Sequence, residues 1–155
     1  MAKDKITVVG AGNVGATTAH IAATRRLGEI VLLDIVKGLA QGKALDMAEA
    51  SGLYGSEQRI VGTTDWSAAA GSDVVIVTSG VPRKPGMSRD DLLATNANIV
   101  KSVSQQIAAH CPDAFVIVVC NPLDAMVYAV AKTTGFPQRR IVGMAGALDS
   151  ARFCY

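Results

Sequence analysis

The sequence of 155 residues has little cysteine, histidine or net charge. Its three cysteines form no Cys-x-x-Cys pair and its two histidines stand apart, so the spacings typical of a disulfide framework or a zinc site are missing. Fifteen basic residues against thirteen acidic ones leave a formal charge of +2, which argues against nucleic-acid and acidic-membrane partners. No apolar run approaches the roughly 18 residues of a membrane span. We therefore expect no bound metal, no nucleic acid and no membrane partner.

The beginning of the sequence also lacks the apolar core of a signal peptide. Residues 1–5 run directly into a predicted strand, so we expect a cytoplasmic location. Half of the residues are hydrophobic, and a chain of this length forms one domain with a sizeable core.

Short β-branched runs alternate with longer helical patterns along the whole chain. The apolar runs are continuous rather than alternating, which is typical of parallel strands buried on both faces. Parallel neighbours need crossover connections, so the pattern predicts an α/β fold: a doubly wound, Rossmann-type parallel sheet of about six strands with helices on both faces. The predicted strands are 6–9, 30–33, 59–63, 73–78, 115–119 and 141–144, and the predicted helices are 13–26, 39–51, 89–110 and 123–134.

A glycine-rich turn, Gly10-Ala11-Gly12-Asn13-Val14-Gly15, follows the first predicted strand and precedes a helical pattern. In this motif the first glycine permits a tight turn, the second lets the backbone approach a pyrophosphate, and the third lets helix and strand pack closely. Unpaired N–H groups at a helix N-terminus favour an anion. Alone the motif is weak evidence, but its position between a strand and a helix predicts a dinucleotide-binding loop.

Asp34 ends the second predicted strand, 22 positions after Gly12. A carboxylate there can accept hydrogen bonds from both hydroxyls of an adenosine ribose, and it repels a 2′-phosphate. The next residue, Ile35, supplies no compensating cation. The sequence therefore predicts NAD rather than NADP as the cofactor.

Further polar residues follow later strands, at the edge where open α/β sheets bind ligands. Arg83 and Arg89 bracket a Pro-Gly turn in the loop 78–89, and guanidinium groups bind carboxylates bidentately. On spacing alone, a solvated basic loop is an equal alternative. Asn121 follows the fifth strand with a donor and an acceptor. Asp149 fits an ordinary helix cap, and Arg152 shares its face.

Six segments, in this order, resemble the lactate/malate dehydrogenase family, and within it the bacterial malate dehydrogenases of the lactate-dehydrogenase-like type. They are the loop 10–15, Asp34, the loop 79–89, the run Asn-Ala-Asn-Ile at 96–99, Val-Cys-Asn-Pro-Leu-Asp-Ala at 119–125 and Gly-Ala-Leu-Asp-Ser-Ala-Arg-Phe at 146–153. The resemblance implies that residues 1–155 form the NAD-binding, N-terminal half of a dehydrogenase whose substrate domain is absent from this chain. It also implies a homo-oligomer that uses the helix near 39–51.

The resemblance implies a role for each matched residue. Arg83 meets the distal carboxylate of malate or oxaloacetate, Arg89 polarises the ketone oxygen, and Arg152 binds the carboxylate beside the reacting carbon. Asn121 contacts substrate and nicotinamide, and Asp149 orients a catalytic histidine. The cofactor contacts are Gly10, Ala11, Gly12, Asn13, Val14, Gly15, Asp34, Thr78, Ser79, Gly80, Asn96, Val119 and Asn121.

The histidine that the family uses as its base lies beyond the match to Arg152, outside these 155 residues. His20 and His110 fall away from the strand ends, so we expect the chain to bind NAD but to oxidise malate negligibly alone. Two alternatives stay open: a stand-alone, non-catalytic dinucleotide-binding module, and a fragment of a lactate-type 2-hydroxy-acid dehydrogenase. Arg83 disfavours the second, because lactate dehydrogenases usually carry glutamine there.

Overall fold

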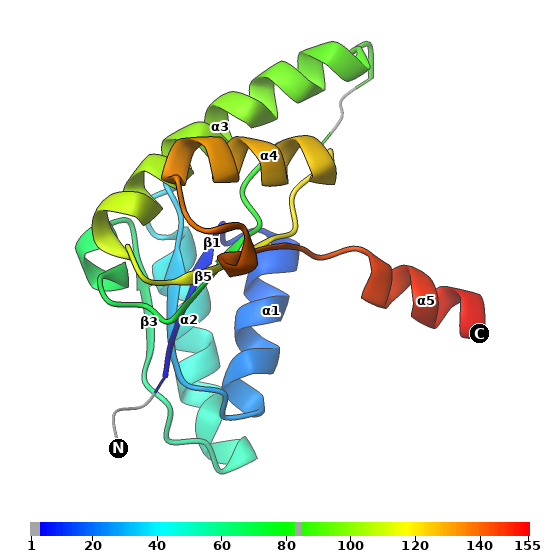
Figure 1. Cartoon of the computed structure of the whole chain (residues 1–155). Helices are drawn as coiled ribbons and strands as arrows, with labels where there is room; N and C mark the ends of the chain where they lie inside the picture. The colour runs from blue at the N-terminus through cyan, green and yellow to red at the C-terminus, as the bar shows by residue number, and fades with distance from the viewer. Residues whose placement is uncertain (1–3, 83–84) are drawn as a thin grey trace.

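The computed structural model describes residues 4–82 and 85–155. In this part of the chain, six parallel strands form one sheet in the order β3-β2-β1-β4-β5-β6 (Figure 1). The order reverses between β1 and β4, which is where doubly wound sheets open a crevice for ligands. The strands are β1 (Lys5–Val9), β2 (Glu29–Leu33), β3 (Ile60–Thr63), β4 (Val74–Val77), β5 (Phe115–Val118) and β6 (Ile141–Gly143).

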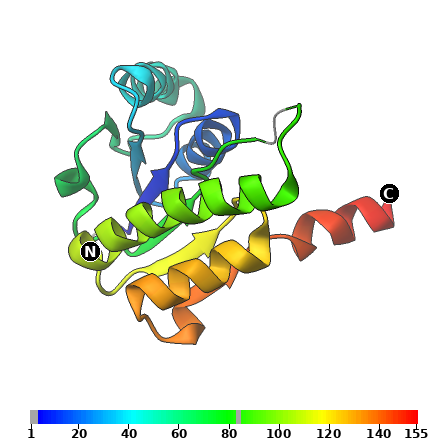
Figure 2. The same cartoon turned by 90° about the horizontal axis from the view of Figure 1, so that it is seen from above.

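Helices connect the strands and cover both faces of the sheet. Figures 1 and 2 show α1 and α2 on one face and α3 and α4 on the other. The prediction of a doubly wound α/β fold is therefore confirmed. The helices are α1 (Asn13–Thr24), α2 (Leu39–Ala50), α3 (Arg89–His110), α4 (Leu123–Thr134) and α5 (Gly146–Cys154), with short 3-10 turns η1 (Ser51–Tyr54), η2 (Trp66–Ala69) and η3 (Gln138–Arg140).

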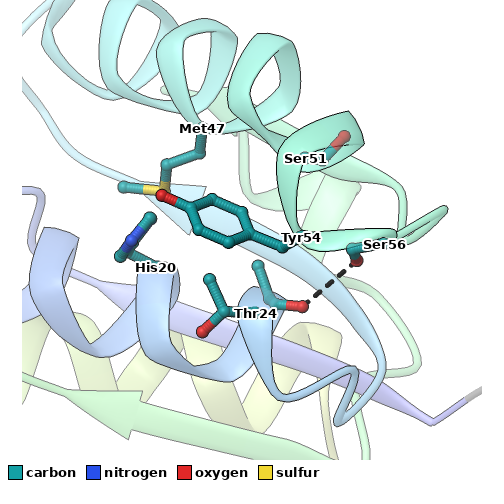
Figure 3. A pocket seen from close by; sticks show the side chains of 7 residues that line it. His20, Thr24, Met47, Ser51, Tyr54 and Ser56 are labelled. Carbon is teal, nitrogen blue, oxygen red and sulfur yellow. Dashed lines mark hydrogen bonds between the residues drawn. The ribbon is translucent and has the colours of Figure 1, made fainter.

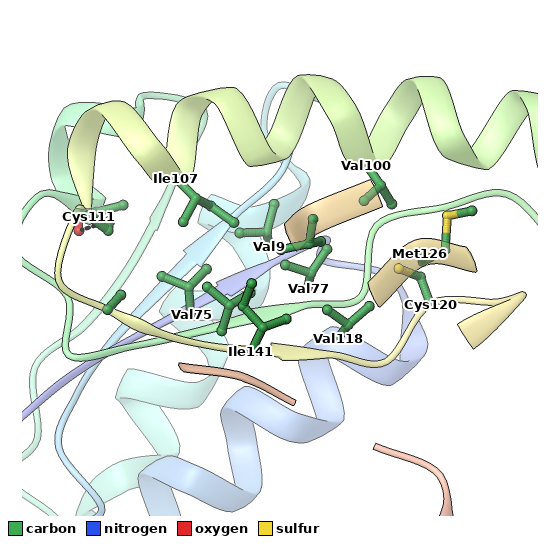
Figure 4. Packing of buried hydrophobic residues seen from close by; sticks show 14 of the residues in the cluster. Val9, Val75, Val77, Val100, Ile107, Cys111, Val118, Cys120, Met126 and Ile141 are labelled. Carbon is green, nitrogen blue, oxygen red and sulfur yellow. Dashed lines mark hydrogen bonds between the residues drawn. The ribbon is translucent and has the colours of Figure 1, made fainter. Parts of the chain in front are cut away.

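The sheet separates two cores, and alternate side chains of β4 enter one or the other, because successive residues of a strand point to opposite faces. On β4, Val75 and Val77 pack beneath α3 and α4 together with Val100 and Ile107 (Figure 4). Ile76, between them, faces α1 and α2. Both cores hold the strands in place, so the carboxyl ends of β1, β4 and β5 form a rigid edge beneath the connecting loops.

The third strand is the weakest in the sequence because glycines interrupt it, yet β3 pairs in parallel with β2 along its whole length. Gly62 lies where α2 crosses the strand, and a Cβ atom added there would overlap the backbone of Ala40 and Gln41. The glycine therefore permits close packing of helix on strand, and it does not end the strand.

The last helix differs from the others. Every residue from 142 to 155 is exposed, and α5 extends away from the sheet (Figures 1 and 2). In the part of the chain that the structure describes, no helix combines the length and the apolar character needed to cross a bilayer.

Candidate functional site

A cleft of about 610 Å³ opens at the carboxyl edge of the sheet, beside the point where the strand order reverses. Its size falls within the range of pockets for small molecules and cofactors. The loops after β1, β4 and β5 form its walls, and α3 contributes one side. The lining residues are Gly12, Asn13, Val14, Gly15, Thr78, Gly80, Val81, Pro82, Leu92, Asn96, Val119, Cys120 and Asn121.

The glycine-rich loop presents unpaired backbone donors to this cleft. Helix α1 begins at Asn13 with Gly12 as its N-cap, and no side chain caps it. The N–H of Gly10 donates to the Leu33 carbonyl, whereas the amides of residues 12–15 meet no acceptor within the described ranges 4–82 and 85–155. Four unpaired N–H groups at a helix N-terminus attract an anion of the size of a phosphate.

The three glycines of the loop serve different purposes. Gly10 has a φ of +103°, which favours glycine. Gly15 packs so closely that an added Cβ would overlap the carbonyl oxygen of Gly10 and meet the Thr78 hydroxyl. Gly12 has an extended backbone, and an added Cβ would meet nothing within 4 Å. The fold therefore requires Gly10 and Gly15, while the space beside Gly12 is left for a ligand.

Asp34 lies at the end of β2 and is already hydrogen-bonded to the loop. Its carboxylate accepts from the N–H of Ala11 at 2.6 Å and from the N–H of Val36 at 2.9 Å. These two bonds hold the carboxylate beside the glycine loop, and each oxygen keeps a further acceptor position. The arrangement suits a carboxylate that accepts hydrogen bonds from ribose hydroxyls next to a bound pyrophosphate.

The hydroxyls of Thr78 and Ser79 face the glycine loop. Thr78 donates to the carbonyls of Val9 and Gly10 at 3.0 and 3.1 Å, and Ser79 donates to Val9 at 3.1 Å. Thr78 also lines the cleft, whereas Ser79 does not. In this structure both side chains brace the end of β1 against the end of β4.

Asn96 is the polar side chain that joins the cleft's loops. It is almost fully buried, and its amide oxygen accepts from the N–H of Val81 at 2.9 Å. Its amide nitrogen donates to the carbonyl of Asn121 at 2.7 Å and to that of Val81 at 3.3 Å. Both donors are therefore occupied by backbone, so one lone pair on the oxygen is left for a ligand.

Arg89 is the first residue of α3, and a capping box fixes this helix start. The Ser88 hydroxyl accepts from the N–H of Asp91, and Ser88 in turn donates to the Asp91 carboxylate, which lowers the pKa of Asp91. Arg89 is exposed and shares a helix face with Leu92 and Asn96, both of which line the cleft. Arg83, the other arginine of this loop, lies outside the described residues.

Asp149 and Arg152 are brought together with each other but not with the cleft. They form an ion pair of 3.2 Å on α5, and both side chains are largely exposed. Sequence spacing predicted that they share a helix face, and this is confirmed. Their roles at a substrate stay predictions, because α5 extends away from the sheet (Figure 2) and none of its residues lines the cleft.

The two histidines and the cleft cysteine have packing environments. His20 meets Tyr54 edge to face, beside a cavity of about 10 Å³ that has room for one water molecule at most (Figure 3). His110 stacks on Trp66. Burial raises the pKa of the Cys120 thiol, so this cysteine is protonated at neutral pH and is a poor nucleophile.

One residue at the site was missed by sequence reasoning. The Lys43 ammonium of α2 donates to the carbonyl of Ala11 at 2.7 Å. Its signal is its place in the apolar stripe of α2: it is three residues after Ala40 and four before Met47, both of which are buried. A lysine inside such a stripe needs a polar partner.

The strand order, the glycine loop and the acid at the end of β2 define a dinucleotide-binding domain of the Rossmann type. Residues 4–143 match the NAD-binding domain of lactate and malate dehydrogenases. The chain belongs to the lactate/malate dehydrogenase family, and its cofactor is NAD.

Similar proteins agree with this assignment. The chain is 56% identical over 155 residues to a malate dehydrogenase of Caulobacter vibrioides, covering all of this chain and 48% of the relative. A Geotalea uraniireducens malate dehydrogenase is 57% identical over 153 residues, which are 99% of this chain and 48% of that protein. The chain thus spans about half the length of the curated relatives it matches.

Solved structures superpose closely. Malate dehydrogenase from Picrophilus torridus in its apo form gives a TM-score of 0.95 at 48% identity, covering 98% of this chain and 49% of that one. Lactate dehydrogenase from Cryptosporidium parvum, complexed with lactic acid and nicotinamide adenine dinucleotide, gives 0.94 at 43% identity, covering 99% and 48%.

Proposed function

We propose that this domain holds NAD for the oxidation of malate to oxaloacetate and for the reverse reduction. The observation that carries the proposal is the row of unpaired amides at residues 12–15, with the Asp34 carboxylate fixed beside it. The amides bind the pyrophosphate, and Asp34 accepts the ribose hydroxyls. Asn13, Val14, Gly80 and Val119 line the same cleft and complete the cofactor site.

The substrate that fits this chain is a small dicarboxylate. NAD, when bound, accepts the hydride from the carbon that bears the malate hydroxyl. Asn121 offers a donor and an acceptor at the end of β5, and Arg89 lies on the cleft-facing side of α3. Arg83 binds the distal carboxylate. Moving this second negative charge out of water is costly unless a cation pairs with it, and an arginine pairs with a carboxylate through two hydrogen bonds. Arg152 binds the other carboxylate once α5 is brought to the cleft.

The base for the hydroxyl proton comes from the part of the relatives' length that this chain does not span. His20 and His110 pack against Tyr54 and Trp66, away from the residues that line the cleft. General acid–base help is worth roughly 10²–10⁴-fold in rate. Asp149 then orients the histidine that serves as this base.

Reconstitution tests this division of labour. The 155-residue chain is expected to bind NAD in titration calorimetry and to reduce it negligibly with malate. Adding the complementary segment of the Caulobacter relative should restore malate-dependent NADH formation, measured by absorbance. Absence of NAD binding would contradict the proposed function. Full activity of the 155-residue chain alone would contradict the proposal that the base comes from outside these residues.

The same assay separates malate from lactate. A lactate dehydrogenase is among the structural neighbours, at 43% identity, so a lactate-type activity is the second candidate. Since Arg83 matches a dicarboxylate, malate is expected to be preferred in the reconstituted enzyme by about 100-fold or more. Equal turnover of lactate would favour the second candidate.

Asp34 is expected to set the choice between NAD and NADP. Asp34→Ser should weaken NAD binding about tenfold, through loss of the ribose acceptor, and should lower the NADP-to-NAD ratio of dissociation constants by at least tenfold, through loss of repulsion. Titration calorimetry with both cofactors measures the two effects. Asp46→Ser on the exposed face of α2 is the matched control and should leave the ratio unchanged. An unchanged ratio in Asp34→Ser would contradict the assignment.

We further propose a homo-oligomer and a cytoplasmic location. Helices α1 and α2 and the turn η1 each carry an exposed apolar side chain: Ile21, Leu45 and Leu53 are 47%, 61% and 85% exposed. Such a surface suits a subunit interface. The free thiols of Cys111, Cys120 and Cys154 suit a reducing compartment.

A further inference from the structure

Lys43 makes a contact that the proposed chemistry of the site does not use. It lies on α2, is partly buried, and its ammonium donates to the Ala11 carbonyl at 2.7 Å. Within the described part of the chain, no carboxylate lies within 4 Å of this ammonium. The side chain of Lys43 leaves the apolar stripe of α2 and ends at the Ala11 carbonyl, so this hydrogen bond is the polar contact that its ammonium makes.

Ala11 is consequently held on both sides by charged groups. Its N–H donates to the Asp34 carboxylate at 2.6 Å, and its carbonyl accepts from Lys43. Hydrogen bonds of this charge-assisted kind are shorter and roughly twice as strong as neutral ones. The two peptide units that flank Ala11 are therefore oriented before any ligand arrives.

The orientation matters because the Ala11 carbonyl and the Gly12 N–H belong to the same planar trans peptide unit and point in opposite directions. Lys43 holds the carbonyl toward α2, so the Gly12 N–H points away from α2. Gly12 lines the cleft, α2 contributes no residue to the cleft lining, and the Gly12 N–H has no acceptor in the described chain.

We infer that Lys43 is a positioning residue of the NAD site, which aims the Gly12 amide at the pyrophosphate by holding the Ala11 carbonyl. This inference rests on the proposed NAD site. Removing the ammonium frees the 11–12 peptide to rotate, and the bound state then has to restore its orientation at a cost. The effect falls on ligands that contain a pyrophosphate and spares those without one.

Lys43→Met keeps the apolar stem and removes the donor. It is expected to weaken binding of NADH and of ADP-ribose about tenfold and to change adenosine binding less than twofold. NADH fluorescence measures the first, and displacement of NADH measures the other two. Lys43→Arg, which keeps a charged donor, should recover most of the lost affinity.

Lys101→Met on the exposed face of α3 is the matched control, because it removes the same charge far from Ala11 and should bind like the wild type. Lys43→Gln, whose end group is too short to reach Ala11, is carried through the same titrations in case the methionine variant does not fold. Titrations in 0.5 M salt screen any long-range effect of the charge, whereas the loss caused by a misoriented amide persists.

The inference is overturned if the Lys43 variants bind ADP-ribose within twofold of the wild type, if adenosine is weakened equally, or if Lys101→Met shows the same loss. A wild-type chain that binds neither NADH nor ADP-ribose would instead remove the proposed NAD site. The two failures are therefore distinguishable.

Discussion

Gly15→Ala is expected to lower the free energy of unfolding by about 3 kcal/mol, the upper end of the usual cost of overpacking. The reason is steric, since the added methyl would overlap the carbonyl oxygen of Gly10 and meet the Thr78 hydroxyl. Backbone is the obstacle, so no side-chain rotation relieves it. Urea unfolding followed by circular dichroism measures the change, and the midpoint should fall without a change in slope.

Gly42→Ala is the matched control for this experiment. Gly42 lies in the middle of α2, and an added Cβ would meet nothing within 4 Å. Alanine in a helix interior is about 0.5–1 kcal/mol more favourable than glycine, so this variant should be more stable than the wild type. If Gly15→Ala unfolds at the wild-type midpoint, the result contradicts the close packing of α1 on the end of β1.

The elements of this fold are predictable where local signals agree with the tertiary structure. Helix α3 occurs over the predicted residues 89–110, because a serine N-cap and an acid three residues later mark its start. The short turn η1 was not predicted, since Ser51–Tyr54 carries two polar or small residues and no periodicity. Gly62 interrupts the apolar pattern of β3 in the sequence, and the passage of α2 over the strand explains why a glycine is there.

The site was predictable as a set of loops but not as a set of contacts. The glycine motif and Asp34 are found from spacing alone, because each follows a strand of the same sheet. The partners of Asn96 lie 15 and 25 residues away in sequence, and Lys43 reaches a carbonyl 32 residues back. The packing of helices on the sheet brings these residues, which are far apart in sequence, into contact, and no periodic pattern in the sequence predicts which of them meet. The preference for NAD is predicted from the Asp34 carboxylate, with no cation at the next residue, Ile35. The cation that the structure brings to the glycine loop, Lys43, lies on α2, one turn after the helix begins at Leu39.

Gly12→Ala is expected to weaken NAD binding about 100-fold while the unfolding midpoint stays within error of the wild type. Gly12 has an extended backbone that alanine adopts equally well, and its Cβ position is open in the cofactor-free chain. The fold therefore accepts the methyl group, whereas a pyrophosphate that approaches the amides of residues 12–15 meets it directly.

Titration calorimetry with NAD, beside urea unfolding, separates these two effects. Gly12→Ala should lose binding and keep stability, Gly15→Ala should lose stability, and Gly42→Ala should bind NAD like the wild type. The contrast between two glycines three residues apart isolates the ligand's own requirement from that of the fold. If Gly12→Ala binds NAD as tightly as the wild type, the pyrophosphate lies elsewhere than against this helix start, and the role given to the unpaired amides is wrong.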